Sequence, residues 1–134
     1  MKIEGGCYCG EVRYEANGDP MMQAQCHCRE CQYITGGQPN MIVAMPKDGF
    51  SYAKGGPKGF ARSDLDNPVT RFFCENCGTA IGTETPALPG AMILKVGTMD
   101  DPGFYSPQVA IFTKDRQSFH HIAEGVAAFD TVPG

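Results

Sequence analysis

The chain has no concentrated stretch of basic residues. Its 11 Lys and Arg residues are scattered and are outnumbered by 15 Asp and Glu residues, which gives a formal net charge of −4. Nucleic-acid binding needs a concentrated basic face that can contact phosphates. The charge pattern therefore argues against nucleic acid as the main partner, and it disfavours a nucleic-acid-binding zinc ribbon.

Long apolar runs are also missing. No run approaches the roughly 18 residues that a membrane-spanning helix requires. Residues 1–6, with the sequence MKIEGG, contain no apolar segment typical of a signal peptide. We therefore expect a cytoplasmic protein without a membrane segment. In such a reducing compartment, closely spaced cysteines bind metal or react more often than they form disulfides.

Composition favours a single globular domain over residues 1–134. The hydrophobic content is 42% and the charged content 19%, and no repeat, linker or low-complexity segment is visible. The 17 Gly and 10 Pro residues divide the chain into short segments, which favours strands over long helices. The sequence therefore predicts a mainly β fold with one or two short helices.

Strand patterns are found in several of these segments. Residues 11–16 alternate, with Val12 and Tyr14 on one side and charged residues on the other, and residues 91–98 place Met92, Leu94 and Val96 on one face. Other predicted strands cover residues 41–45, 69–73, 79–83 and 108–113, with 69–73 and 79–83 forming a hairpin. Short helices are predicted at residues 29–34 and at 116–123, where Phe119, Ile122 and Ala123 recur at helical spacing.

All seven cysteines fall into spacings that suit metal ligands. They form a C-x-C pair, a C-x-C-x-x-C triplet and a C-x-x-C pair, namely Cys7 and Cys9; Cys26, Cys28 and Cys31; Cys74 and Cys77. Four thiolates close a tetrahedral zinc site, whereas three leave one position for water or substrate. The odd count therefore predicts one closed site and one open site, and two Zn²⁺ ions per chain.

The two pairs together supply four ligands. Joining Cys7 and Cys9 to Cys74 and Cys77 would tie the N-terminus to the middle of the chain, so zinc there would contribute folding free energy. We expect this set to bind structural zinc. The alternative is that the two pairs bind different metals or none.

The triplet Cys26, Cys28 and Cys31 supplies three ligands. A thiol that binds the fourth position of such an ion is deprotonated and becomes a nucleophile near neutral pH. The alternative is a fourth protein ligand that closes the site. His27 should point away in an extended C-x-C, because neighbouring side chains alternate. His120 and His121 could fold back to the site.

Three segments resemble the glutathione-dependent formaldehyde-activating enzyme family, which is also named for centromere protein V. They are GGCYCGEVRY at residues 5–14, CHCREC at residues 26–31 and RFFCENCGT at residues 71–79. The resemblance implies the Mss4-like fold, in which several small antiparallel sheets surround zinc sites. It implies structural zinc at Cys7, Cys9, Cys74 and Cys77, and catalytic zinc at Cys26, Cys28 and Cys31.

The resemblance also implies an activity. Members condense glutathione with formaldehyde to S-hydroxymethylglutathione, which is a carbon–sulfur lyase reaction in reverse. The expected partners are therefore a small thiol such as glutathione and a small aldehyde. The alternative is a non-catalytic zinc-binding module of the same fold that binds other proteins. The oligomeric state does not follow from the sequence.

The chain departs from the family pattern near the late strand 108–113. Many members carry a histidine near this strand and a tryptophan soon after, whereas this chain has Ala110 and Phe119 there and no tryptophan. Residues at these positions could shape the substrate pocket, so the sequence does not determine which substrate the chain uses. Because glutathione is acidic, we expect cations near its site, and Arg29, Arg62 and Lys114 are candidates.

Overall fold

The computed structural model describes residues 1–133 and is mainly β, as predicted. One α-helix, α1, covers Arg29–Thr35. The strands are β1 Lys2–Gly6, β2 Arg13–Asn17, β3 Met22–Cys26, β4 Asn40–Pro46, β5 Phe50–Lys54, β6 Lys58–Phe60, β7 Thr70–Phe73, β8 Ala80–Glu84, β9 Ala91–Lys95, β10 Val109–Ile111 and β11 Ala127–Ala128. Short 3-10 helices are η1 Lys47–Gly49, η2 Val96–Thr98, η3 Pro102–Phe104 and η4 Thr113–Asp115.

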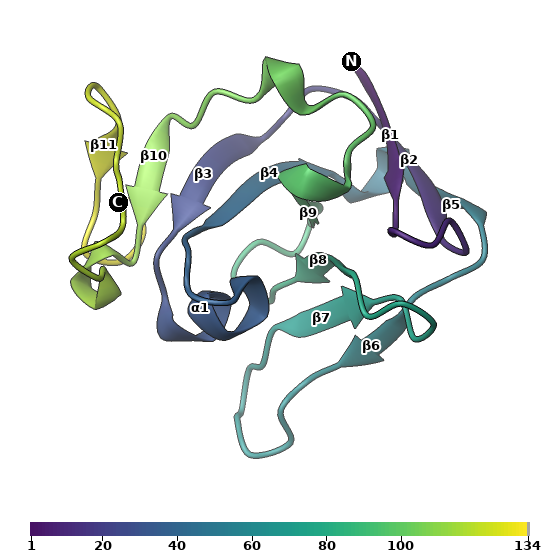
Figure 1. Ribbon diagram of the computed structural model, residues 1–134, viewed down its shortest axis with the longest axis horizontal. Coiled ribbons are helices and arrows are strands. Elements are labelled where there is room, and N and C mark those ends of the chain that lie inside the picture. Colours follow the sequence, from purple (N-terminus) through teal and green to yellow (C-terminus); the bar gives the residue numbers. More distant parts are fainter. Residues whose placement is uncertain (134) are drawn as a thin grey trace.

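The strands form two sheets (Figure 1). The small sheet has the order β1-β2-β5 and is antiparallel. The large sheet has eight strands in the order β11-β10-β3-β4-β9-β8-β7-β6. Strand β10 pairs in parallel with both β3 and β11, and the other pairs of this sheet are antiparallel. In Figure 1 the small sheet lies at the right, and β10 and β11 lie at the left.

The small sheet packs on one face of the large sheet. Val43 and Met45 on β4, and Met92 and Leu94 on β9, share a core with Tyr14 of the small sheet. All five side chains are at most 1% exposed. Successive residues of a strand point to opposite faces, so this set occupies every second position of β4 and β9. The core between the sheets therefore uses one face of the central strands.

The opposite face of the same strands carries a second apolar cluster. It includes Ile42 on β4, Ile93 on β9 and Ile111 on β10, together with Cys26 and Cys31. These residues alternate with those of the first core, as the pleat requires. The cysteine triplet thus lies on the face of the large sheet that the small sheet does not cover.

All six sequence-predicted strands are present, with shifted ends. The segments predicted at 11–16, 41–45, 69–73, 79–83 and 108–113 correspond to β2, β4, β7, β8 and β10. The hairpin of β7 and β8 is antiparallel, as predicted. The segment predicted at 91–98 ends its strand at Lys95 and continues as η2, yet Met92, Leu94 and Val96 still pack on one core. Strands β1, β3, β5, β6 and β11 were not predicted from the sequence.

Helix α1 is confirmed and has clear ends. The Cys28 side chain accepts a hydrogen bond from the Cys31 backbone N–H at the N-terminus. At the C-terminus Gly36 adopts a left-handed conformation with φ of 83°, and its N–H donates to the Gln32 carbonyl. This short helix positions two cysteines of the triplet.

The helix predicted at 116–123 is wrong. This segment contains only a turn, closed by a bond from the His120 N–H to the Gln117 carbonyl over 3.0 Å. Phe119 is 62% exposed, so the apolar spacing that suggested a helix does not create a buried face. Within residues 1–133, no helix is both long and apolar enough to cross a membrane.

Candidate metal centres and adjoining cavities

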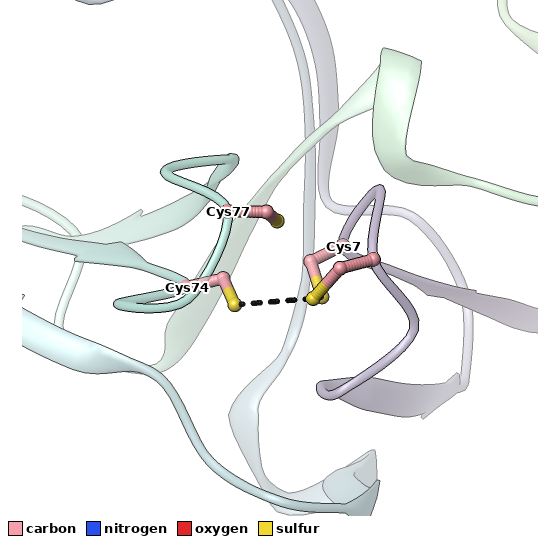
Figure 2. A group of neighbouring side chains, drawn as sticks. Cys7, Cys74 and Cys77 are labelled. Atoms are coloured by element: carbon pink, nitrogen blue, oxygen red, sulfur yellow. Dashed lines mark hydrogen bonds between the residues drawn. The ribbon is translucent and has the colours of Figure 1, made fainter.

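The four cysteines of the two pairs converge between the two sheets. Their sulfur atoms all lie within 4.8 Å of one another. Cys7 and Cys9 come from the turn between β1 and β2, and Cys74 and Cys77 from the turn between β7 and β8. Figure 2 shows the Cys74 and Cys77 side chains facing Cys7 on the neighbouring turn. This group could hold a metal ion, as the sequence predicted.

The sulfur spacing fits a tetrahedral zinc site. The Sγ atoms of Cys7 and Cys9 are 3.6 Å apart, and those of Cys9 and Cys74 are 3.8 Å apart. A tetrahedron with Zn–S bonds of about 2.3 Å has edges of about 3.8 Å. These two spacings match the edges of such a tetrahedron, and the other sulfur pairs of the group lie within 4.8 Å.

Glycines allow both turns to bend tightly. Gly10 and Gly78 have φ of 82° and 78°, a left-handed region in which a Cβ is strained. The Gly10 N–H donates to the Cys7 carbonyl over 3.1 Å, and the Gly78 N–H donates to the Cys74 carbonyl over 2.7 Å. The second turn is one residue longer than the first, and both turns bring their sulfurs into the same group.

Polar groups around the sulfurs favour thiolates. The Val12 N–H donates to Cys7 Sγ over 3.2 Å, and the Asn76 amide donates to Cys9 Sγ over 3.3 Å. The Thr79 oxygen accepts from the Tyr8 N–H, which leaves its hydroxyl hydrogen for Cys77 Sγ at 3.1 Å. This hydrogen bond to Thr79 lowers the pKa of Cys77 to about 6. A metal ligand must be deprotonated, so this environment suits metal binding.

The cysteine triplet forms a second group. The sulfurs of Cys26, Cys28 and Cys31 all lie within 4.8 Å of one another. Cys26 ends β3, Cys28 is the N-cap of α1 and Cys31 is in its first turn. No other His, Cys, Asp or Glu joins this group among residues 1–133. The geometry thus offers three protein ligands.

Two polar side chains support the triplet from the central strands. The Asn40 amide donates to Cys31 Sγ over 3.6 Å, and Lys95 Nζ donates to Asn40 Oδ1 over 2.6 Å. Hydrogen bonds from the Cys26 and Cys28 thiols lower the pKa of Cys31, with a smaller contribution from Asn40. Burial lowers the pKa of Lys95 to about 8. One thiolate of the triplet is therefore strongly favoured.

The histidines considered as a fourth ligand lie elsewhere. His27 Nδ1 is 3.0 Å from His120 Nδ1, and both residues are buried. His120 Nδ1 accepts from the Gln117 N–H, and its Nε2 donates to the Gly37 carbonyl over 2.7 Å. His27 Nδ1 must then carry the hydrogen that it shares with His120. His27 and His120 thus bind each other and fix the C-terminal segment to the loop of the triplet.

A model of the family described as glutathione-dependent formaldehyde-activating enzyme matches residues 2–115. The chain belongs to this family. A search of curated proteins found no match. The chain is similar to a solved structure of a protein from Rhodobacter sphaeroides, with a TM-score of 0.57 and 19% identity over 75% of this chain and 88% of the other. At this identity the likeness concerns the fold alone.

In this member of the formaldehyde-activating family, an apolar cavity of about 400 Å³ adjoins the triplet. Cys26 and Cys31 line it, together with Asn40 and Arg71. We call this cavity the chamber. Most of its remaining wall is apolar and comes from the sheet face opposite the small sheet, including Met22, Ile42, Leu88, Ile93, Ile111 and Phe112.

A second cavity of about 310 Å³ lies beside helix α1 and the segment between β6 and β7. Arg29, Arg62 and Arg71 line it, so we call it the arginine groove. The structure thus brings two predicted cations, Arg29 and Arg62, to one groove. The third, Lys114, lies in η4 and lines neither the groove nor the chamber.

Arg71 connects the two cavities, because it lines both. Its side chain is 15% exposed, and its guanidinium lies 3.5 Å from Glu30 in the first turn of α1. Sequence reasoning missed Arg71, as well as Asn40 and Lys95. Arg71 directly precedes the motif Phe72-Phe73-Cys74, but nothing in that local pattern shows that its side chain reaches the other cysteine group.

Proposed function

We propose that the protein is a zinc-dependent carbon–sulfur lyase that forms or cleaves the adduct of a small thiol and a small aldehyde. One observation carries this proposal: three cysteine sulfurs converge at the wall of a cavity, with no fourth His, Cys, Asp or Glu among residues 1–133 in their group. Three protein ligands are typical of catalytic zinc. Membership of the glutathione-dependent formaldehyde-activating family supports glutathione as the thiol and formaldehyde as the aldehyde.

In this proposal the two cysteine groups have different roles. Cys7, Cys9, Cys74 and Cys77 hold structural zinc between the two sheets. Cys26, Cys28 and Cys31 hold catalytic zinc, which gives two Zn²⁺ ions per chain. When bound at the triplet, zinc supplies a positive charge that lowers the pKa of an approaching thiol.

The surrounding residues position the reactants. The guanidinium groups of Arg29, Arg62 and Arg71 offer positive charge for the carboxylates of glutathione. These carboxylates would exchange with the present partners, Asp64 of Arg62 and Glu30 of Arg71. Arg71 lies where the groove meets the chamber, so a thiol bound through its carboxylates extends its sulfur toward Cys31. Asn40, held by Lys95, keeps Cys31 in a fixed orientation.

The reaction is a balanced addition. The sulfur of the thiol forms a bond to the aldehyde carbon, and the electron pair of the carbonyl π bond moves to the oxygen. That oxygen takes up a proton, and the thiol has lost one, so nothing is oxidised or reduced. Cleavage of the adduct is the same step in reverse.

Exchange NMR of glutathione and formaldehyde, with and without the zinc-loaded protein, tests this function. We expect faster exchange between free and adduct signals, and loss of that acceleration in Cys28→Ser. Cobalt(II) in place of zinc gives a second readout. Glutathione should change the absorption of cobalt bound to the triplet and leave that of the four-cysteine group unchanged.

No acceleration together with no change at the triplet cobalt would refute this function for glutathione and formaldehyde. That result would favour the non-catalytic zinc module. A protein with two closed sites would bind both metals and respond to no small thiol.

A further inference from the structure

The chamber is far larger than formaldehyde requires. Cavities of about 300–1,000 Å³ usually enclose ligands of drug-like size. Formaldehyde has one carbon and one oxygen, so it would fill only a small part of a cavity of about 400 Å³. The chamber therefore offers binding area that a one-carbon aldehyde cannot use.

The chemistry of the wall is equally specific. Ile42, Ile93 and Ile111 belong to the apolar face of the large sheet that the small sheet leaves uncovered. Leu88 and Phe112 extend this apolar surface. An aliphatic chain bound here would remove its own apolar surface and that of the chamber wall from water. This burial is the main source of affinity for such a site.

The chamber does not suit the body of glutathione. Among residues 1–133, Arg71 is the one charged residue that lines it, although its wall also includes Asn40, Thr83 and Thr85. Glutathione carries two carboxylates, an ammonium group and two amides, which need several partners when they are taken out of water. The arginine groove is lined by three guanidinium groups and by one carboxylate, that of Glu30, so its net positive charge matches those carboxylates better.

The two cavities meet at the reacting position. Arg71 and Val69 line both of them, and Cys26 and Cys31 lie in the chamber wall. A thiol that enters along the groove and an aldehyde whose chain fills the chamber would therefore bring sulfur and carbonyl carbon together beside the triplet.

We propose that the chamber binds the apolar chain or ring of an aldehyde larger than formaldehyde. The inference rests on the proposed function and specifies its substrate class. The bond changes are those of the addition above: a C–S bond forms, the carbonyl π electrons go to oxygen, and the oxygen takes up a proton. No further reactant is required.

Direct binding can be measured without turnover. Hexan-1-ol cannot react with a thiol in this way but has the same chain as hexanal. In zinc-loaded protein with labelled isoleucine methyl groups, hexan-1-ol should shift the signals of Ile42, Ile93 and Ile111. Ile3 and Ile81 lie in the core between the sheets and should not respond. Shifts spread equally over all five residues, or no shifts, would overturn the proposal.

Turnover provides the second test. With glutathione held constant, kcat/KM should rise at least tenfold from formaldehyde to hexanal or benzaldehyde. Ala87 is exposed and lines the chamber, so Ala87→Trp should remove this preference by lowering kcat/KM for hexanal much more than kcat/KM for formaldehyde. Ala53→Trp, on exposed β5 of the small sheet, is the matched control and should keep the preference.

The outcomes separate the two proposals. Equal or better turnover of formaldehyde, with no effect of Ala87→Trp, would overturn the larger aldehyde and leave the lyase function intact. No turnover of any aldehyde would refute the lyase function. In that case the methyl shifts with hexan-1-ol still report whether the chamber binds an apolar chain.

Discussion

Lys95 on β9 donates a hydrogen bond from Nζ to Oδ1 of Asn40 on β4, over 2.6 Å. Asn40 in turn donates to Cys31 of the triplet. A lysine that is largely buried thus supports a candidate metal ligand through one intervening amide. Its amine has lost most of its water, and this loss has a consequence for stability that depends on pH.

The Lys95→Met variant should lose part of the pH dependence of stability. Burial lowers the folded-state pKa of Lys95 to about 8 from the usual 10.5. Between these values the unfolded chain binds more protons, so the free energy of unfolding rises with pH. Below pH 8 Lys95 is charged in the folded and in the unfolded chain. Burial of this charge then lowers the free energy of unfolding by its full amount, which is at most about 3 kcal/mol.

Urea unfolding at several pH values between 7 and 10.5 measures this effect. The wild type should gain stability between about pH 8 and pH 10.5. The difference in the free energy of unfolding between the wild type and Lys95→Met should therefore change over this pH range. Lys58→Met, at an exposed position on β6, is the control and should follow the wild-type profile. Parallel profiles for the wild type and Lys95→Met would contradict the assignment.

Loss of one cysteine from each group should have different effects. Cys77→Ser should remove one metal and destabilise the whole protein, because the four-cysteine group joins two sheets. Cys28→Ser should weaken the other metal and leave the fold largely intact. Metal analysis after gel filtration and thermal unfolding measure both effects. Equal damage from the two changes would contradict this division of roles.

Gly82 should tolerate no larger side chain. A Cβ at this position on β8 would lie 2.4 Å from the Ile93 carbonyl oxygen on the paired strand β9. Because a backbone atom cannot move away cheaply, we expect Gly82→Ala to lower the free energy of unfolding by about 1–3 kcal/mol. Chemical denaturation measures the change.

Gly90 provides the control for Gly82. A Cβ at Gly90 meets no atom within 4 Å. Gly90→Ala should therefore be neutral, or stabilise by up to about 1 kcal/mol because it restricts the unfolded chain. A loss of stability in Gly90→Ala as large as in Gly82→Ala would show that the contact with Ile93 is not the cause.

Removal of the Arg71 charge should weaken thiol binding. In Arg71→Gln we expect the KM for glutathione to rise roughly tenfold, which is about 1.4 kcal/mol, with a smaller change in kcat. Steady-state kinetics at low and high salt would show a weaker salt dependence than in the wild type. Lys114→Gln is the control, since Lys114 lines neither cavity. Equal effects of both variants would exclude the arginine groove as the thiol site.

Short sequence patterns predicted those features of the structure whose residues lie close together along the chain. The short spacings in Cys26-x-Cys28-x-x-Cys31 bring three sulfurs together through one strand end and one helical turn. The alternation of Val12 and Tyr14 likewise predicted a half-buried strand, and both residues are at most 2% exposed.

The remaining features depend on contacts between distant segments. The bond between His27 and His120 joins residues 93 positions apart, and that between Asn40 and Lys95 spans 55 positions. No spacing rule predicts such pairs. The false helix at 116–123 has the same origin, because this segment is held by His120 against the triplet loop rather than by an apolar helical face.

The position of the four-cysteine group along the chain has a consequence for biosynthesis. All four ligands precede residue 78, whereas strand β9, which joins β4 to β8, begins only at Ala91. During translation the turns β1–β2 and β7–β8 leave the ribosome before β9 does, so a metal held by these four cysteines would connect them before β9 can pair. If the group binds metal, the supply of metal during translation would influence which strands the growing chain pairs first.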